Sequence, residues 1–439
     1  MDWLPALALM LGLLCGAMAL GLPVAFAFFG VNIVGAVIFL GGEPGLDQMA
    51  RNTFASMSSF TLAPIPLFLL MGEILFHTGV AFKAIDAVDK LIARVPGRLS
   101  IVSVLGGTIF SSLSGSTIAN TAVLGSALLP DMLKRGYHPT IAMGPIMATG
   151  SIAMLIPPSA LAVLLGSLAG ISIAKLLIAG IIPGLVMSVA FLGYIVIRCA
   201  INPTLAPAYD VAHLTLGERV RPFMIYVVPL FAIFVVVVGS ILAGWATPTE
   251  SAALGSVASA IAAMGYGLFT WRKFMVAVLE ATKISVMILF IIGASVTFSQ
   301  ILAFSGATSG LLEVINTVGA SPVALVIAML GVLLFLGAFM DQVSMMMITL
   351  PFFIPLGQAI GIDLLWFGVL MLVVMEISFT TPPFGLLIYV MKGVAPESIT
   401  LRQVYMAAMP FIVLELMVLA LIFLVPELAT WLPEIMRGR

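Results

Sequence analysis

Two apolar regions of the sequence, residues 98–170 and 322–394, are interrupted by runs of serine, threonine, glycine and proline. Such runs break a helix, because proline removes a backbone donor and glycine is a poor helix former. In a membrane, the freed carbonyls and nearby hydroxyls suit a small cation such as Na⁺, whereas the N-terminal ends of half-helices suit an anionic group. The interruptions therefore predict sites for ions and for a negatively charged solute.

The candidate ligands of Na⁺ and of the solute fall into four short segments, two in each region. The first region supplies Ser112, Ser114, Gly115, Ser116, Thr117, Asn120, Ser151, Pro157, Pro158 and Ser159. The second supplies Gly337, Asp341, Ser344, Glu376, Ser378, Thr380, Thr381, Pro382, Pro383 and Gly385. We expect 111–120 and 151–159 to form one oxygen-lined cage, and 337–344 and 378–385 to form a second. The same small residues can instead serve close packing of membrane helices.

Two of these candidates, Asp341 and Glu376, are acids within apolar segments, where a charge is expensive and usually functional. The alternative is that each is protonated or hydrogen-bonded to a neighbouring helix. Glu73 also lies in an apolar stretch, and we expect it to serve helix packing. Because the interruptions offer many hydroxyls and few acids, they favour Na⁺ over a relay of protons. No arginine is expected inside the membrane, so helix ends and amides would hold an anionic solute.

The two regions correspond to each other at a constant spacing of 225 residues, without gaps. Identical residues at this spacing are Gly106 and Gly331, Pro130 and Pro355, Gly136 and Gly361, Pro157 and Pro382, and Pro158 and Pro383. Glycine and proline are common in this chain, so coincidence is the alternative. Paired interrupted segments in two halves of a chain are typical of a transporter binding site.

The composition sets the class of protein. The chain has 439 residues, of which 62% are hydrophobic and 8% are charged, whereas a soluble domain carries about 25% charged residues. This excludes a soluble enzyme, a disordered protein and a nucleic-acid-binding protein, the last of which needs a basic face. Two cysteines provide neither a disulfide framework nor a cysteine-based metal site. At about 20 residues a span, the chain has apolar material for about a dozen membrane crossings.

The distribution of positive charge predicts how the segments are oriented. Lysine and arginine surround the first interrupted region, but none lies between Lys283 and Lys392. Because positive charge stays in the cytoplasm, both ends of 98–135 should face the cytoplasm and both ends of 322–361 the opposite side. Each segment is then a re-entrant hairpin, and the two halves are inverted relative to each other. Alternation places both termini in the periplasm.

The predicted fold is an all-α polytopic membrane protein with inverted repeats, two re-entrant hairpins and two interrupted helices, 137–170 and 362–394. Clear candidate spans are 4–21, 23–41, 59–79, 177–197, 222–244, 250–270, 284–304 and 403–425. We assign 1–97 and 222–321 to a scaffold and 98–197 and 322–425 to a transport domain. Residues 198–221 are predicted to be a cytoplasmic loop, and 426–439 a tail.

Several motifs add a family resemblance. Gly244-Trp245-Ala246-Thr247-Pro248-Thr249-Glu250-Ser251-Ala252-Ala253 contains a predicted capping box, formed by Thr247 and Glu250 with Pro248 at the first helical position. This segment resembles a signature of the large membrane subunit of tripartite ATP-independent periplasmic (TRAP) transporters. Met340-Asp341, Thr381-Pro382-Pro383-Phe384-Gly385 and Ile181-Ile182-Pro183-Gly184 are similar to the same family, and the resemblance covers essentially the whole chain.

The resemblance implies an elevator-type secondary transporter of the bacterial inner membrane, driven by a Na⁺ gradient and without an organic cofactor. It also implies two partners, a small four-span membrane subunit on a separate polypeptide and a periplasmic substrate-binding protein. Its expected solutes are organic acids. One departure is that Ser159 follows the first proline pair and Phe384 the second, so the two cation cages need not be equivalent.

Three other classes of protein can be weighed against the sequence. A self-sufficient Na⁺- or H⁺-coupled anion symporter could share the inverted-repeat plan. A channel is disfavoured because its pore would repeat a charged or carbonyl ring around an axis. An enzyme is disfavoured because no nucleophile–base pair or metal triad is visible.

Overall fold

A computed structural model describes residues 2–92, 95–114, 117–207, 215–382 and 385–435, without the side chains of 110–114, 119, 316 and 318. These residues form helices and no strand. The first half contains α1 (Trp3–Ala19), α2 (Val24–Phe39), α3 (Glu43–Met57), η1 (Phe60–Leu62), α4 (Pro64–Thr78), α5 (Val80–Leu91), α6 (Arg98–Ser114), α7 (Thr117–Lys134), α8 (Pro139–Leu155), α9 (Ala160–Ala169), α10 (Ile173–Ala179) and α11 (Ile181–Ile201). The second contains η2 (Pro203–Leu205), α12 (Leu216–Pro222), η3 (Phe223–Val227), α13 (Val228–Leu242), α14 (Pro248–Gly265), α15 (Trp271–Phe304), α16 (Ala307–Val318), α17 (Pro322–Gly337), α18 (Gln342–Ala359), α19 (Leu364–Thr380), α20 (Leu386–Val394), α21 (Leu401–Leu424) and α22 (Glu427–Ile435).

The helices begin and end where local chemistry dictates. Thr247 and Glu250 form the predicted capping box at the start of α14, with Pro248 in its first turn. A second capping box, Thr215 with Glu218, starts α12 inside the segment that the sequence suggested was a loop, and α11 continues to Ile201. That loop is therefore shorter than predicted, because side-chain capping stabilises a helical turn in a polar segment.

Fewer helices are long enough to span a bilayer than the composition suggested. Among the described residues, six stretches qualify by length and hydropathy: Phe60–Thr78, Ile173–Ile201, Leu216–Leu242, Trp271–Phe304, Gln342–Ala359 and Leu401–Leu424. The pair α8 and α9, bent by 44°, makes a seventh if it counts as one span. This count is below a dozen because several further apolar helices have only 10–17 residues, and 17 residues reach about 25 Å at the α-helical rise. These short helices include α17, α19 and part of α6.

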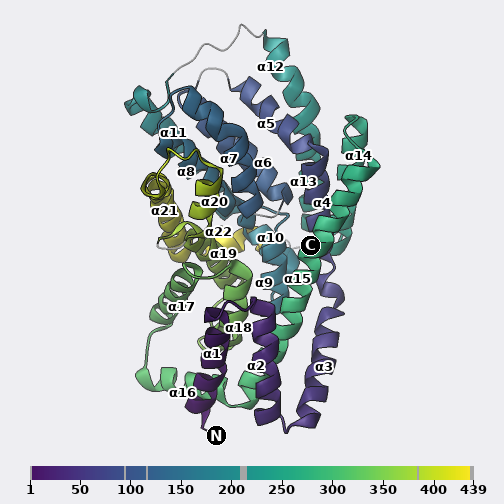
Figure 1. Ribbon diagram of the computed structural model, residues 1–439, viewed down its shortest axis with the longest axis vertical. Helices are drawn as coiled ribbons and strands as arrows, with labels where there is room; N and C mark the ends of the chain where they lie inside the picture. The colour runs from purple at the N-terminus through teal and green to yellow at the C-terminus, as the bar shows by residue number, and fades with distance from the viewer. Residues whose placement is uncertain (1, 93–94, 115–116, 208–214, 383–384, 436–439) are drawn as a thin grey trace.

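The order of the helices repeats along the chain. In the first half α6 and α7 pack on α8, and α8 also packs on α11. In the second half α17 and α18 pack on α19, and α19 also packs on α21. Figure 1 shows α6 and α7 in the upper part of the molecule and α17 and α18 in the lower part. The amphipathic helices that precede these pairs, α5 and α16, lie at opposite ends (Figure 1).

The two halves meet through the broken helices. Helix α8 packs against both α19 and α21, and α7 packs against α20. Around them, α4 packs against α14 and α15, and α15 also packs against α2 and α3. The centre of α8 and of α19 is thus surrounded by protein, which is the setting that interrupted helices require in a membrane.

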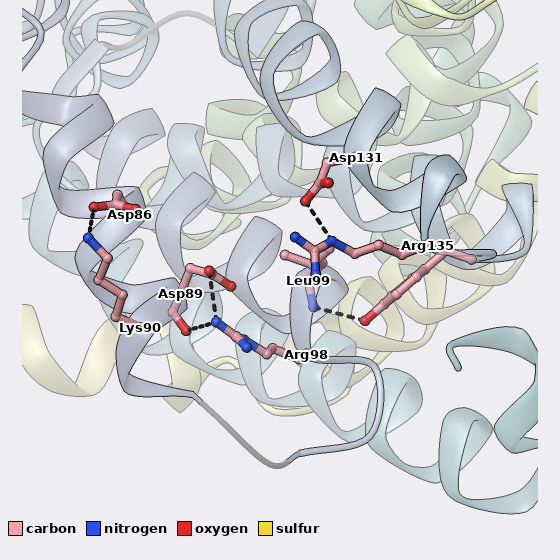
Figure 2. A network of polar contacts seen from close by, with 8 residues as sticks. Asp86, Asp89, Lys90, Arg98, Leu99, Asp131 and Arg135 are labelled. Atoms are coloured by element: carbon pink, nitrogen blue, oxygen red, sulfur yellow. Dashed lines mark hydrogen bonds and ion pairs between the residues drawn. The ribbon is translucent and has the colours of Figure 1, made fainter. Parts of the chain in front are cut away.

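Charged contacts secure the end of α6 that starts the first interrupted region (Figure 2). Arg98 donates from Nη2 to the Asp89 carbonyl at 2.6 Å and to its Oδ2 at 2.8 Å, which joins α6 to α5. Arg135 donates to Asp131 at 2.8 Å near the end of α7, and Lys90 donates to Asp86 at 2.6 Å. Burial raises the pKa of the Asp89 carboxyl, and the Arg98 guanidinium opposes this shift.

Candidate functional site

The interrupted regions converge on the carboxylate of Glu376, in α19. Its side chain is 1% exposed, and Oε1 accepts hydrogen bonds from Thr117 Oγ1 at 2.5 Å and from Gln342 Nε2 at 3.0 Å. Thr117 is the first residue of α7 and Gln342 the first of α18. The starts of both second hairpin helices therefore reach the same acid, one from each half of the chain.

Gly150 of α8 makes room for this arrangement. A Cβ added at Gly150 would lie 2.0 Å from Thr117 Cγ2 and 3.5 Å from Glu376 Oε2. Gln342 also approaches Met154 of α8, with its Nε2 3.8 Å from the sulfur. The broken helix of the first half is thus a wall of the Glu376 centre.

The residues on either side of Gly150 make two further polar contacts. Asn120 Nδ2 donates to Thr149 Oγ1 at 2.8 Å, and both side chains are fully buried. Ser151 Oγ donates to Glu415 Oε1 of α21 and to the carbonyl of Ala148 at 2.9 Å. Three consecutive residues of α8 therefore face polar groups from α7, α19 and α21.

In the second half, Asp341 caps α18. Its Oδ1 accepts from the backbone N–H of Val343 at 3.0 Å and of Ser344 at 3.1 Å, and its Oδ2 accepts from Ser344 Oγ. Gly337, the last residue of α17, lies against α19, because an added Cβ would be 1.9 Å from Ser378 Oγ. Asp341 and Ser344 thus contact each other, while Gly337 and Ser378 connect the hairpin to the broken helix.

The hydroxyls at the breaks mostly bond within their own helices. Ser159 caps α9 by accepting from Ala162 N–H at 3.2 Å. Thr380 and Thr381 both donate to the carbonyl of Ile377, at 3.0 and 2.6 Å. Ser378 donates to the carbonyl of Met375 at 2.7 Å. Ser378, Thr380 and Thr381 thus donate to carbonyls near the end of α19, and their oxygens keep lone pairs for a ligand.

The remaining predicted residues divide into two groups. Pro157 and Pro158 are buried between α8 and α9, and Pro382 is exposed after α19. Gly385 precedes α20, where a Cβ would lie 2.8 Å from the carbonyl carbon of Thr380. Gly115, Ser116 and Pro383, and the side chains of Ser112 and Ser114, lie outside the described residues.

The residues of these contacts that were not identified from the sequence include Thr149, Gly150, Gln342 and Glu415. Gln342 could have been found, because it lies 225 residues after Thr117 and within a predicted hairpin. Glu415 is an acid inside an apolar span, which is itself a functional signal. Gly150 gave no signal, because its contacts come from helices that are distant in the sequence.

A separate cavity of about 480 Å³ lies between η1, the α9–α10 connection and the start of α14. Its lining includes Thr61, Ser167, Ser172, Thr247 and Thr249, and the hydroxyl oxygens of Thr61 and Ser167 are 3.4 Å apart. None of the side chains that contact Glu376 lines it. The resemblance motif at 244–253 therefore borders a crevice between segments assigned to the scaffold and to the transport domain.

Interrupted apolar helices that meet at a buried polar centre define an all-helical membrane transporter. The fold resembles that of the YdaH transporter of Alcanivorax borkumensis, with a TM-score of 0.63, 13% identity, and coverage of 90% of each chain.

Residues 11–428 match the family described as tripartite ATP-independent periplasmic transporter, DctM component, and the chain belongs to this family. It is 31% identical to the C4-dicarboxylate TRAP transporter large permease protein of Pseudomonas aeruginosa, over 92% of this chain and 93% of that protein. It is 27% identical to the sialic acid large permease protein of Vibrio cholerae, over 96% and 97% of the two chains. The chain is thus a multi-pass permease of the inner membrane rather than an enzyme, and its family works with a small membrane subunit and a periplasmic binding protein.

Proposed function

We propose that this permease imports an organic acid with Na⁺, and that a periplasmic binding protein delivers the acid. The observation that carries the proposal is the convergence of Thr117 and Gln342 on Glu376. A buried carboxylate with a hydroxyl against it offers oxygen ligands that suit Na⁺, and the helix N-termini beside it suit the carboxylate of a solute. The ion and the solute would then bind close together, and the binding of one would favour the binding of the other.

The proposed mechanism is an elevator in which 98–197 and 322–425 move as a transport domain against 1–97 and 222–321. The packing of α8 on α19 and α21 supports a single transport body, because it joins the two predicted halves of that domain. The placement of the two hairpins in opposite parts of the molecule (Figure 1) supports inverted repeats. In this topology both termini are periplasmic and the 198–221 segment is cytoplasmic.

The solute is proposed to be a carboxylate, because relatives are named for C4-dicarboxylates and for sialic acid. The partner in the membrane is proposed to be a four-span subunit. Since the binding protein would select the solute, its ligand preference should be measured first, by calorimetry with C4-dicarboxylates, sialic acid and other sugar acids.

Uptake into proteoliposomes tests the proposed function. The permease, the small subunit and the ligand-loaded binding protein are reconstituted together, and radiolabelled solute uptake is measured with an inward Na⁺ gradient, an inward K⁺ gradient or no gradient. We expect uptake only with Na⁺, and a loss when either partner is omitted. Equal uptake in the K⁺ gradient would contradict Na⁺ coupling, and undiminished uptake without the binding protein would indicate a self-sufficient symporter.

A further inference from the structure

A second buried acid, Glu415, lies where α21 packs against α8. Its side chain is 1% exposed, and Oε1 accepts a hydrogen bond from Ser151. The other oxygen, Oε2, is buried and has no hydrogen-bond partner among the described residues. A buried polar atom without a partner is destabilising because it has lost its hydrogen bonds to water, and a bound ion would relieve that cost.

Glu415 and Glu376 approach neighbouring residues of α8. Ser151 contacts Glu415, and the adjacent Gly150 faces Glu376 Oε2, which likewise has no hydrogen-bond partner among the described residues. No ion pair found in the described part of the chain includes either acid.

The charge balance of this region requires a positive partner whenever either acid is ionised. Buried charges in proteins are paired or bind metal ions, because an isolated carboxylate in a low dielectric is strongly destabilised. The two unpartnered oxygens and the Ser151 hydroxyl are oxygen ligands, the type that a small hard cation prefers. A purely structural link from Ser151 to α21 would need only an acceptor, which a glutamine would supply as well as a glutamate.

We propose that Glu415 is a Na⁺ ligand, completing with Ser151 and Glu376 a cation site beside the C-terminal part of α8. The site adds a charged group from α21 to the hydroxyls of the predicted first cage. It would tie cation occupancy to the packing of α8 against α21, the helix contact that joins the two halves of the proposed transport domain. The inference rests on the proposed Na⁺ coupling.

Binding of radiolabelled Na⁺ to the purified full-length protein in detergent tests this site. The key variant is Glu415→Gln, which keeps an acceptor for Ser151 and removes the charge. Glu313→Gln is the control, because Glu313 lies on an exposed face of α16. We expect Glu415→Gln to raise the half-saturating Na⁺ concentration at least about ten-fold, the loss of a hydrogen-bonded charge, with an unchanged melting temperature in K⁺ buffer.

The outcomes separate the inference from the proposed function. Saturable Na⁺ binding that is equal in wild type and Glu415→Gln would overturn the inference and leave Na⁺ coupling intact. An absence of Na⁺ binding to the wild type, with Na⁺-independent uptake, would overturn both. If Glu415→Gln unfolds, Glu415→Asp keeps the charge on a shorter side chain. That variant should retain saturable Na⁺ binding with weaker affinity, and wild-type affinity in it would also contradict a ligand at this position.

Discussion

The two halves of the chain place different chemistry at corresponding positions. Thr117 and Gln342 are 225 residues apart, begin equivalent helices and donate to the same oxygen of Glu376. Glu376 itself corresponds to Ser151, which is a donor rather than an acceptor and bonds to Glu415. The donors are thus duplicated while the acid is not. Two halves with a similar order of helix contacts can therefore hold one asymmetric centre, in which the second half supplies the acid and the first half supplies hydroxyls.

A similar contrast occurs in the helices that lead toward the hairpins. In the second half α15 is one continuous helix of 34 residues. In the first half the corresponding stretch is divided into α3 and α4 by the segment 58–63, in which η1 forms and which borders the cavity beside α14. Pro64 and Pro66 follow the division, and proline is tolerated in a first helical turn but breaks a helix interior. The two halves therefore differ both in these helices and in the residues around Glu376.

The largest effect on transport should follow from removing the charge of Glu376, the acid that has no counterpart at the corresponding position of the first half. Glu376→Gln keeps the size of the side chain but replaces the charged carboxylate, which accepts hydrogen bonds from Thr117 and Gln342, with a neutral amide. Hydrogen bonds to a charged group contribute about 1.5–3 kcal/mol, so we expect Na⁺-driven uptake to fall by roughly 10- to 100-fold. Proteoliposome uptake at several Na⁺ concentrations measures this. Wild-type uptake in the variant would show that the acid is structural, and Glu313→Gln serves as the exposed control.

The next largest effect, a lower melting temperature, should follow from alanine substitutions at two close-packed glycines. Gly150→Ala would press on Thr117, and Gly337→Ala would press on Ser378. Overpacking typically costs about 1–3 kcal/mol, so both variants should melt at a lower temperature. The controls are Gly193→Ala in α11 and Gly331→Ala in α17, where nothing lies within 4 Å of the added Cβ. Equal melting temperatures in all four variants would contradict tight packing of Gly150 on Thr117 and of Gly337 on Ser378.

Removing the duplicated donors tests whether they are equivalent. Thr117→Val and Gln342→Met each remove one hydrogen bond to Glu376, which contributes about 1.5–3 kcal/mol. Because the other donor remains and can compensate, we expect a smaller effect than for Glu376→Gln, roughly a ten-fold rise in the half-maximal Na⁺ concentration for each. The conservative variant Thr117→Ser keeps the hydroxyl and should behave like wild type. If only one of the two variants, Thr117→Val or Gln342→Met, raised the half-maximal Na⁺ concentration, the two donors would not be equivalent.

The smallest effect on folding is expected at Asp341. Asparagine is as good a helix cap as aspartate, so Asp341→Asn should keep the bonds to Val343 and Ser344 and leave the melting temperature nearly unchanged. If the carboxylate also acts on the ion, transport should fall although the protein stays folded. Asp341→Ala removes the cap, which costs about 1 kcal/mol, and should lower the melting temperature. Normal Na⁺-dependent uptake in Asp341→Asn would limit Asp341 to a capping role.

Local features were predictable because they depend on neighbouring residues. The capping box at Thr247 and Glu250 forms as its spacing predicts, and the breaks after α8 and α19 fall at the proline pairs. The lengths of the hairpin helices were predictable in outline, since they end near the glycine and serine runs. The start of α12 was missed because its capping box lies in a polar segment without hydrophobic periodicity.

The sequence by itself determined that this is a membrane protein with two interrupted regions and which residue types line the interruptions, because apolar composition and helix-breaking residues act locally. Only the tertiary structure decided that Thr117 and Gln342 both donate hydrogen bonds to Glu376. The same holds for the hydrogen bond from Ser151 to Glu415, and for the bonds by which the Asp341 carboxylate caps its own helix, α18. These pairings join residues up to 264 positions apart. They depend on how α8 packs between α7, α19 and α21, and no local pattern specifies which of several buried polar groups will face one another.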